Sequence, residues 1–215
     1  MKVYGISGLG ADERVYQELN KFMINKIIPL PWIEPLKNEL LKDYLFRFKK
    51  QIDVSEEFIL IGVSFGGMVA VELNKYIMPK QTIIISSNAS KKELPKAFLL
   101  LGYLRVIPLI PKCFLKPPFF LANWLFGIKS TIHKKLLKQI IADTDTVFLK
   151  WAIQQIVSWE NTIVPKTLLR VHGTNDRLLK RNKNEKTIIV KDGGHFMIIE
   201  KAREIAHHLD REIGR

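Results

Sequence analysis

Short apolar runs alternate with segments of helical periodicity along most of the chain. The runs at residues 2–7, 26–30, 58–63, 81–87, 166–172 and 186–190 predict strands. They are almost continuously apolar, which is typical of strands that are buried on both faces of a sheet. Strands that alternate with helices form mainly parallel sheets with helices on both faces. The pattern therefore predicts an α/β fold.

Four helices are predicted from apolar residues at helical spacing. The first is capped by Asp12, the second begins at Pro35, the third follows residue 64 directly and extends to about Met78, and the fourth lies at the C-terminus. The side chains expected to point inward are Val15, Leu19 and Phe22 in the first helix; Leu36, Leu40, Leu41, Tyr44, Leu45 and Phe48 in the second; and Ile198, Ala202, Ile205, Leu209 and Ile213 in the fourth.

The alternation stops at Asn88 and resumes near Lys166. Prolines and aromatic residues break the intervening stretch into several short helices, of which residues 146–159 form the last and most regular. A chain of 215 residues supports one full-sized core. We therefore expect a single domain over residues 1–215, with a core of residues 1–88 and 166–215 and an insertion at about 89–165 above the carboxyl edge of the sheet.

Positive charge is concentrated in this insertion. The chain has a net charge of +13, and the stretch from Ala89 to Lys150 holds eleven Lys or Arg residues against three acids. Leu, Ile, Pro and Phe separate these cations, and no base-reading motif is visible, so nucleic acid is an unlikely partner. A peripheral contact with anionic lipid fits the composition better.

The cellular compartment is suggested by what the sequence lacks. A single cysteine, Cys113, excludes an intramolecular disulfide and a cysteine-rich metal site. The first residues enter a predicted strand at once, which leaves no space for a signal peptide, and no run of 18 uncharged apolar residues exists. We expect a cytoplasmic protein that needs no metal and no cofactor.

The segment at residues 58–71 joins a buried strand directly to a helix through the sequence GVSFGG. A serine at the apex of such a turn has a strained backbone, and small residues two places away on either side let strand and helix approach. Gly62 and Gly66 provide that space around Ser64. We therefore interpret Ser64 as a candidate nucleophile, with the backbone N–H of Phe65 directed toward a developing oxyanion.

Three further loops follow predicted strands and carry residues that complete this chemistry. The carboxyl ends of parallel strands meet at one edge of a sheet, so Asp176 and His195 should lie near Ser64. A serine hydroxyl needs a base such as histidine, and a carboxylate orients and stabilises that histidine as a cation. The glycine-rich loop at residues 7–10 would supply a second oxyanion donor, the backbone N–H of Leu9.

These motifs resemble those of the α/β-hydrolase superfamily. The resemblance rests on GVSFGG at residues 62–67, HGTND at 172–176 and GGH at 193–195, and it spans the whole chain. It implies a minimal version of the fold with about six strands, and a helical cap formed by the insertion. The chain departs from the pattern in two ways. Ser7 stands where relatives often have histidine before Gly8, and the first two strands of the fold are missing.

The expected reaction is hydrolysis of a carboxylic ester or thioester. Leucines and aromatic residues between residues 94 and 128 are numerous enough to line a tunnel for a hydrophobic acyl group. Two alternatives stay open: a hydrolase fold used for lipid or ligand binding without catalysis, and an NAD(P)-dependent oxidoreductase. The second rests on the glycine-rich loop and on the spacing of Ser64, Tyr76 and Lys80.

Overall fold

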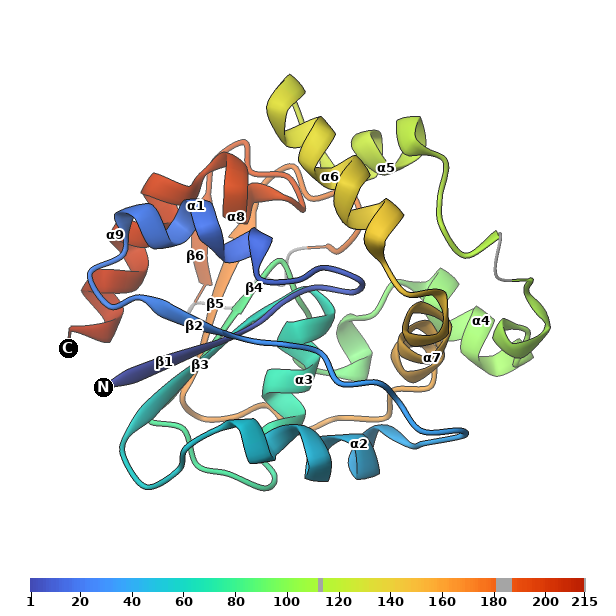
Figure 1. Ribbon diagram of the computed structural model, residues 1–215, viewed down its shortest axis with the longest axis horizontal. Coiled ribbons are helices and arrows are strands. Elements are labelled where there is room, and N and C mark those ends of the chain that lie inside the picture. Colours follow the sequence, from blue (N-terminus) through green and yellow to red (C-terminus); the bar gives the residue numbers. More distant parts are fainter. Residues whose placement is uncertain (112–113, 181–186, 215) are drawn as a thin grey trace.

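The computed structural model describes residues 1–111, 114–180 and 187–214 (Figure 1). Lys112, Cys113 and Lys186, which belong to the predictions above, lie outside the described residues. Six strands form one sheet in the order β2-β1-β3-β4-β5-β6, and every neighbouring pair is parallel. The strands are β1 (Lys2–Ile6), β2 (Ile27–Leu30), β3 (Phe58–Val63), β4 (Gln81–Ile85), β5 (Leu168–Gly173) and β6 (Thr187–Val190). The predicted α/β fold is confirmed.

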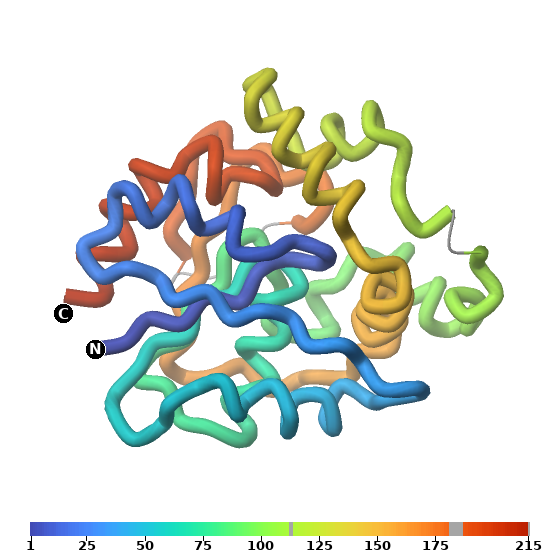
Figure 2. The backbone as a smooth tube through the Cα atoms, viewed as in Figure 1, coloured from blue at the N-terminus to red at the C-terminus, as the bar shows by residue number. Residues whose placement is uncertain are grey.

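Helices cover both faces of the sheet, and each face has its own apolar core (Figures 1 and 2). One layer consists of α1 (Arg14–Phe22), α8 (Met197–Glu200) and α9 (Ala202–Ile213); the other consists of α2 (Leu41–Phe48) and α3 (Phe65–Leu73). The inward face predicted for the C-terminal helix is confirmed, because all five of its predicted residues are buried.

The residues between β4 and β5 form α4 (Lys96–Leu104), α5 (Phe119–Phe126), α6 (Thr131–Asp143) and α7 (Thr146–Val157), with short 3₁₀ turns at Lys91–Glu93 and Ile107–Leu109. These helices gather at the end of the sheet that lies away from both chain termini (Figure 1). They extend both cores: Leu137 and Ile140 of α6 join the core beside α1 and α9, whereas Phe148 and Trp151 of α7 join the core beside α2 and α3.

Two helix boundaries were predicted wrongly. The helix expected to begin at Pro35 begins at Leu41, because Asn38 adopts a left-handed conformation with φ of 58° and the Glu39 carboxylate accepts a hydrogen bond from the Leu36 N–H. As a result, Leu36 and Leu40 are exposed. The third helix ends at Leu73 and not near Met78. The Asn74 amide directly after it bonds to Ala70 O and Thr82 Oγ1, which favours a turn.

The first helix buries the predicted face except at its last residue. Val15 and Leu19 point inward as predicted, but Phe22 is 40% exposed and the Arg203 guanidinium lies over its ring. Tyr16 fills the core instead, and its hydroxyl lies 2.8 Å from Ile6 O and 3.2 Å from Ile61 O, so one proton is shared between two adjacent strands. A buried tyrosine with bonded hydroxyl was not apparent from the apolar pattern.

Candidate active site

The turn between β3 and α3 holds Ser64 in a strained conformation, with φ of 52° and ψ of −119°. The close approach predicted for the flanking glycines is confirmed. A Cβ at Gly62 would collide with the backbone of Gly66, and a Cβ at Gly66 would collide with the carbonyl oxygens of Ile6 and Ser7. The Ser87 hydroxyl donates to Ser64 O at 2.6 Å and fixes the turn from the β4 side.

Ser64, His195 and Asp176 form one line of hydrogen-bonding side chains. His195 Nε2 lies 3.0 Å from Ser64 Oγ, and His195 Nδ1 lies 2.9 Å from Asp176 Oδ2. An ionised carboxylate can only accept, so Nδ1 carries the proton and Nε2 of the neutral ring accepts from the serine hydroxyl. The structure thus brings together three side chains predicted from loops that follow β3, β5 and β6.

The Asp176 carboxylate is almost completely buried, and it is surrounded by donors. Burial would raise its pKa, but the positive charge that His195 carries when protonated, its hydrogen bond and the backbone N–H of Leu179 outweigh this effect and hold the pKa below its usual value. The N–H of Leu178 also donates to Oδ1 at 2.9 Å. Asp176 is therefore ionised.

His172 is a neighbour of Asp176 that sequence reasoning missed. Its Nε2 lies 3.1 Å from Leu179 O and 3.5 Å from Asp176 Oδ2. Burial lowers the pKa of His172, although the Asp176 charge acts in the opposite direction. His172 is therefore neutral, and its Nε2–H donates to Leu179 O, so the ring lies beside the Asp176 carboxylate without a hydrogen bond to it. The sequence pattern gives His172 no role in the site, and its four-residue spacing to Asp176 is the one signal that the sequence offers.

The two predicted oxyanion donors lie on adjacent segments. Leu9 belongs to the loop after β1, and a Cβ on the preceding Gly8 would lie 3.5 Å from Ser64 Cβ. Phe65 opens α3. Among the turn and loop hydrogen bonds of the described residues, neither the Leu9 N–H nor the Phe65 N–H is a donor. Trp32 links the segments, because its ring stacks on Phe65 at 5.5 Å and its Nε1 donates to Gly8 O at 3.3 Å.

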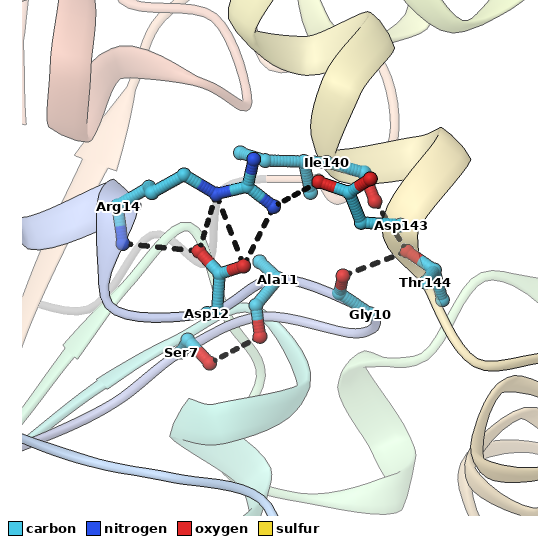
Figure 3. Close-up of polar contacts among 8 residues, drawn as sticks. All are labelled: Ser7, Gly10, Ala11, Asp12, Arg14, Ile140, Asp143 and Thr144. Carbon is cyan, nitrogen blue, oxygen red and sulfur yellow. Dashed lines mark hydrogen bonds and ion pairs between the residues drawn. The ribbon is translucent and has the colours of Figure 1, made fainter.

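The loop after β1 also contacts the helices inserted between β4 and β5 (Figure 3). The Thr144 hydroxyl, directly after α6, lies 2.7 Å from Gly10 O. The Arg14 guanidinium bonds both carboxylate oxygens of Asp12 and lies 2.9 Å from Asp143 Oδ2. The position of this loop is therefore set by the insertion as well as by the sheet.

A cavity of about 400 Å³ opens beside Ser64 and His195. Lys116 is the only Lys, Arg, Asp or Glu among the described residues that line it. The Phe126 ring meets His195 edge to face, with 5.2 Å between the ring centroids. The apolar lining from the inserted helices consists of Phe98, Leu101, Leu125, Phe126, Leu137, Ile140, Ile141, Leu149, Ile153, Ile156 and Val157.

Two other candidates for chemistry do not share this site. The Tyr76 ring packs against Phe46, and Lys80 pairs with Glu57. Because α3 ends at Leu73, these residues are not aligned with Ser64 on one helix as an oxidoreductase would require. Within residues 1–111, 114–180 and 187–214, no group of His, Cys, Asp and Glu side chains could hold a metal ion, and none of the helices is long and apolar enough to cross a membrane.

The sequence matches no protein-family model and no curated protein. Solved structures, in contrast, match over nearly its whole length. A thermophilic esterase from Thermogutta terrifontis superposes with a TM-score of 0.73 at 14% identity, over 99% of this chain and 89% of the esterase. MenH from S. aureus gives 0.69 at 18% identity, over 97% of this chain and 91% of MenH. This chain has the α/β-hydrolase fold.

A third similar structure is a lipase-esterase related protein from Clostridium acetobutylicum, with a TM-score of 0.66 at 16% identity, over 98% of this chain and 93% of that protein. Within the α/β-hydrolase fold of this chain, Ser64, Asp176 and His195 all lie at the carboxyl edge of the sheet, where open α/β sheets bind their ligands. The first strand along the chain is β1, and it ends directly before the loop that carries Leu9.

Proposed function

We propose that this protein is a serine hydrolase that cleaves carboxylic esters or thioesters through an acyl-enzyme. The observation that carries the proposal is the hydrogen-bonded line from Ser64 through His195 to the buried Asp176, at the edge of an apolar cavity. A glycine-rich turn without catalytic function would not require a buried acid and base in two other loops. The likeness to esterases supports the same reaction class.

In this mechanism, Ser64 Oγ attacks the carbonyl carbon while His195 Nε2 takes its proton. Asp176 stabilises the resulting histidine cation, and the N–H groups of Leu9 and Phe65 donate to the oxyanion. The tetrahedral intermediate collapses as His195 protonates the departing alcohol or thiol, which leaves an ester on Ser64. Water then attacks this ester, with His195 again acting as base, and releases the acid.

Labelling with a fluorophosphonate probe tests this proposal directly. We expect one covalent adduct on Ser64, detected as a mass shift, and no adduct in Ser64→Ala. Ser158→Ala, which changes an exposed serine that bonds only within α7, serves as the matched control and should label like the wild type. We also expect Asp176→Asn to lower kcat at least about 10³-fold, because the histidine tautomer is lost. A folded wild-type protein that neither labels nor hydrolyses any ester would disprove the proposal.

The apolar cavity supports a preference for substrates with a hydrophobic acyl group. Each methylene that leaves water for an apolar site gains about 0.8 kcal/mol, which corresponds to about a fourfold change in kcat/KM. We expect kcat/KM for p-nitrophenyl esters and acyl-CoA thioesters to rise at nearly this rate from acetyl until the cavity of about 400 Å³ is full. A preference for acetyl over every longer chain would contradict this assignment.

The outer side of α4, α5 and their connection fits an anionic lipid surface. Large apolar side chains are exposed there beside Lys96 and Arg105, and Arg177 lies over the Trp124 ring. Aromatic side chains next to cations are suited to the boundary of a charged membrane. The exposed apolar residues are Leu100, Tyr103, Leu104, Leu109, Phe114, Phe120, Leu121 and Trp124.

Cosedimentation with vesicles tests this contact separately from catalysis. We expect binding to vesicles that contain phosphatidylglycerol, and at least about tenfold weaker binding to pure phosphatidylcholine. The variant Phe120→Ser/Trp124→Ser should lose most of this binding. The control Ile24→Ser/Met78→Ser removes two exposed apolar side chains far from α5 in the sequence and should bind normally. Vesicle binding in a protein that does not label at Ser64 would favour the non-catalytic alternative.

A further inference from the structure

The loop between β1 and α1 is held at two carbonyl groups, one on each side of Leu9. Gly8 O accepts hydrogen bonds from Ala11 N at 3.0 Å and from Trp32 Nε1 at 3.3 Å. This oxygen belongs to the same planar trans peptide unit as the Leu9 N–H, and the two groups point in opposite directions. Whatever fixes Gly8 O therefore fixes the direction of the Leu9 N–H.

The second carbonyl is that of Gly10, and its partner comes from the far end of α6 (Figure 3). The Thr144 hydroxyl lies 2.7 Å from both Gly10 O and Ile140 O, but it has one proton to donate. Ile140 O already accepts the Thr144 N–H at 3.0 Å. The hydroxyl proton is therefore assigned to the hydrogen bond with Gly10 O.

The shape of the loop depends on this contact. Gly10 is left-handed, with φ of +68°, and a Cβ there would lie 2.5 Å from Thr144 Cγ2. The Thr144 side chain therefore fits directly against the space that Gly10 leaves open. Ser7 Oγ donates to Ala11 O at 2.7 Å, so the two ends of the loop are also joined to each other. A shift of Gly10 would be transmitted through Ala11 to Gly8 O and the Leu9 N–H.

An ion-pair bridge holds the same end of α6 in place. Arg14 binds Asp12 in its own segment and Asp143, the residue before Thr144. Burial would raise the pKa of Asp12, but its hydrogen bonds and charge interaction with Arg14 lower it. The bridge therefore joins the residue before Thr144 to the segment that follows Gly10.

We propose that Thr144 is a positioning residue for the oxyanion hole: its hydroxyl holds the Gly10 carbonyl and so directs the Leu9 N–H at the oxygen of the reacting carbonyl. This inference rests on the serine-hydrolase function proposed above. Thr144 lies at the end of an inserted helix, more than 130 residues from Gly10 in the sequence. By this proposal it contributes to the stabilisation of the transition state.

The variants Thr144→Val and Thr144→Ser test the role of the hydroxyl. Valine keeps the shape of threonine without the donor, whereas serine keeps the donor. Outright loss of an oxyanion donor costs about 10²–10³ in kcat, and misdirection of one should cost less. We expect kcat of Thr144→Val to fall about tenfold with KM within twofold, and Thr144→Ser to retain at least about half of kcat. Thr131→Val makes the same change at the other end of α6 and should leave kcat unaltered.

A transition-state analogue separates positioning from a general structural effect. The inhibition constant of an alkyl trifluoromethyl ketone, which forms an oxyanion on Ser64, should rise in Thr144→Val by the same factor by which kcat falls. If Thr144→Val does not fold, Arg14→Gln loosens the same helix end and should lower kcat about two- to threefold at unchanged KM.

The outcomes distinguish this inference from the proposed function. Wild-type kcat and inhibition constant in Thr144→Val, in a protein that labels at Ser64, would overturn the role of Thr144 and leave the hydrolase function intact. A rise in KM without a fall in kcat would also overturn it. Absence of Ser64 labelling in the wild type would overturn both.

Discussion

The insertion consists of two halves that meet the core in different ways. The rear half, residues 131–157 with α6 and α7, is tied to the core by polar groups. Glu200 Oε1 accepts the N–H groups of Lys129 and Ser130 directly before α6, and Trp151 Nε1 of α7 donates to Glu39 O at 2.8 Å. The front half, residues 96–126 with α4 and α5, also bonds to the core, because Phe126 O accepts the Phe196 N–H at 3.1 Å, but it exposes large apolar side chains such as Tyr103, Leu109 and Phe120.

This difference separates two tasks. Hydrogen bonds have defined directions, so the rear half can fix the geometry of the loop that carries Leu9. Apolar contacts are less directional; both halves line the cavity with apolar side chains, and the front half also presents an apolar surface on its outer side. We therefore expect changes in the rear half to reduce stability and turnover, and changes on the outer side of the front half to affect binding only.

The largest combined effect on turnover and stability is expected at the joint between the core and the rear half. Gly10→Ala places a Cβ against Thr144 and forces a left-handed alanine. We expect kcat to fall about 100-fold and the free energy of unfolding, measured in urea, to fall by about 2–3 kcal/mol. In Gly10→Ala/Thr144→Ser the colliding Cγ2 is absent, so part of both losses should be recovered. Equal losses in the single and double variants would show that Thr144 does not press on this loop.

A smaller effect is expected where α6 begins. Glu200→Ala removes the acceptor for the N–H groups of Lys129 and Ser130. Because unsatisfied groups at a helix N-terminus cost about 1–2 kcal/mol, we expect a loss of this size in the free energy of unfolding. Glu204→Ala changes a carboxylate one turn further on that makes neither bond, and it should cost under about 0.5 kcal/mol. Similar losses in the two variants would mean that α6 is not anchored through Glu200.

How far the sequence predicts this molecule depends on the range of the interactions involved. The strands were predictable because continuous apolar runs need no distant information, and Ser64, Asp176 and His195 were predictable because each follows a strand at the same edge of the sheet. The start of α2 was not predictable, because it depends on a left-handed Asn38 and a carboxylate contact from Glu39.

Supporting residues of the candidate site were also beyond prediction. Thr144, Trp32 and His172 each occur in unremarkable local sequence, and their contacts with the site are seen only in the folded structure. No periodicity marks a threonine whose hydroxyl meets a loop from the other end of the chain. Residues that carry out the chemistry occur in recognisable sequence motifs. Residues that position them are recognised only from their contacts in the folded structure.

The ion-pair bridge on the rear half should respond to pH. Arg14 lowers the pKa of Asp12 in the folded state, so the bridge contributes stability above the unfolded pKa of about 3.9 and loses it as pH falls through the lowered folded value. Because Asp12 is partly exposed and screened by solvent, we expect Asp12→Asn to cost only about 0.5–1 kcal/mol at pH 7. In urea titrations, this difference from the wild type should vanish well below pH 4 and shrink in high salt. A difference independent of pH would exclude the ion pair as its cause.

The smallest effect on stability is expected on the outer side of the front half, and it sharpens the comparison most. Leu109 is 80% exposed, whereas Leu137 of α6 is 2% exposed, so the same change to serine tests both halves. We expect Leu109→Ser to change the free energy of unfolding by under about 0.5 kcal/mol, because its side chain loses little contact, and Leu137→Ser to cost about 3 kcal/mol or more. If Leu109→Ser cost more than about 1 kcal/mol, the outer side of the front half would be covered in solution, and a loss that grew with protein concentration would identify a second copy of the chain as its cover.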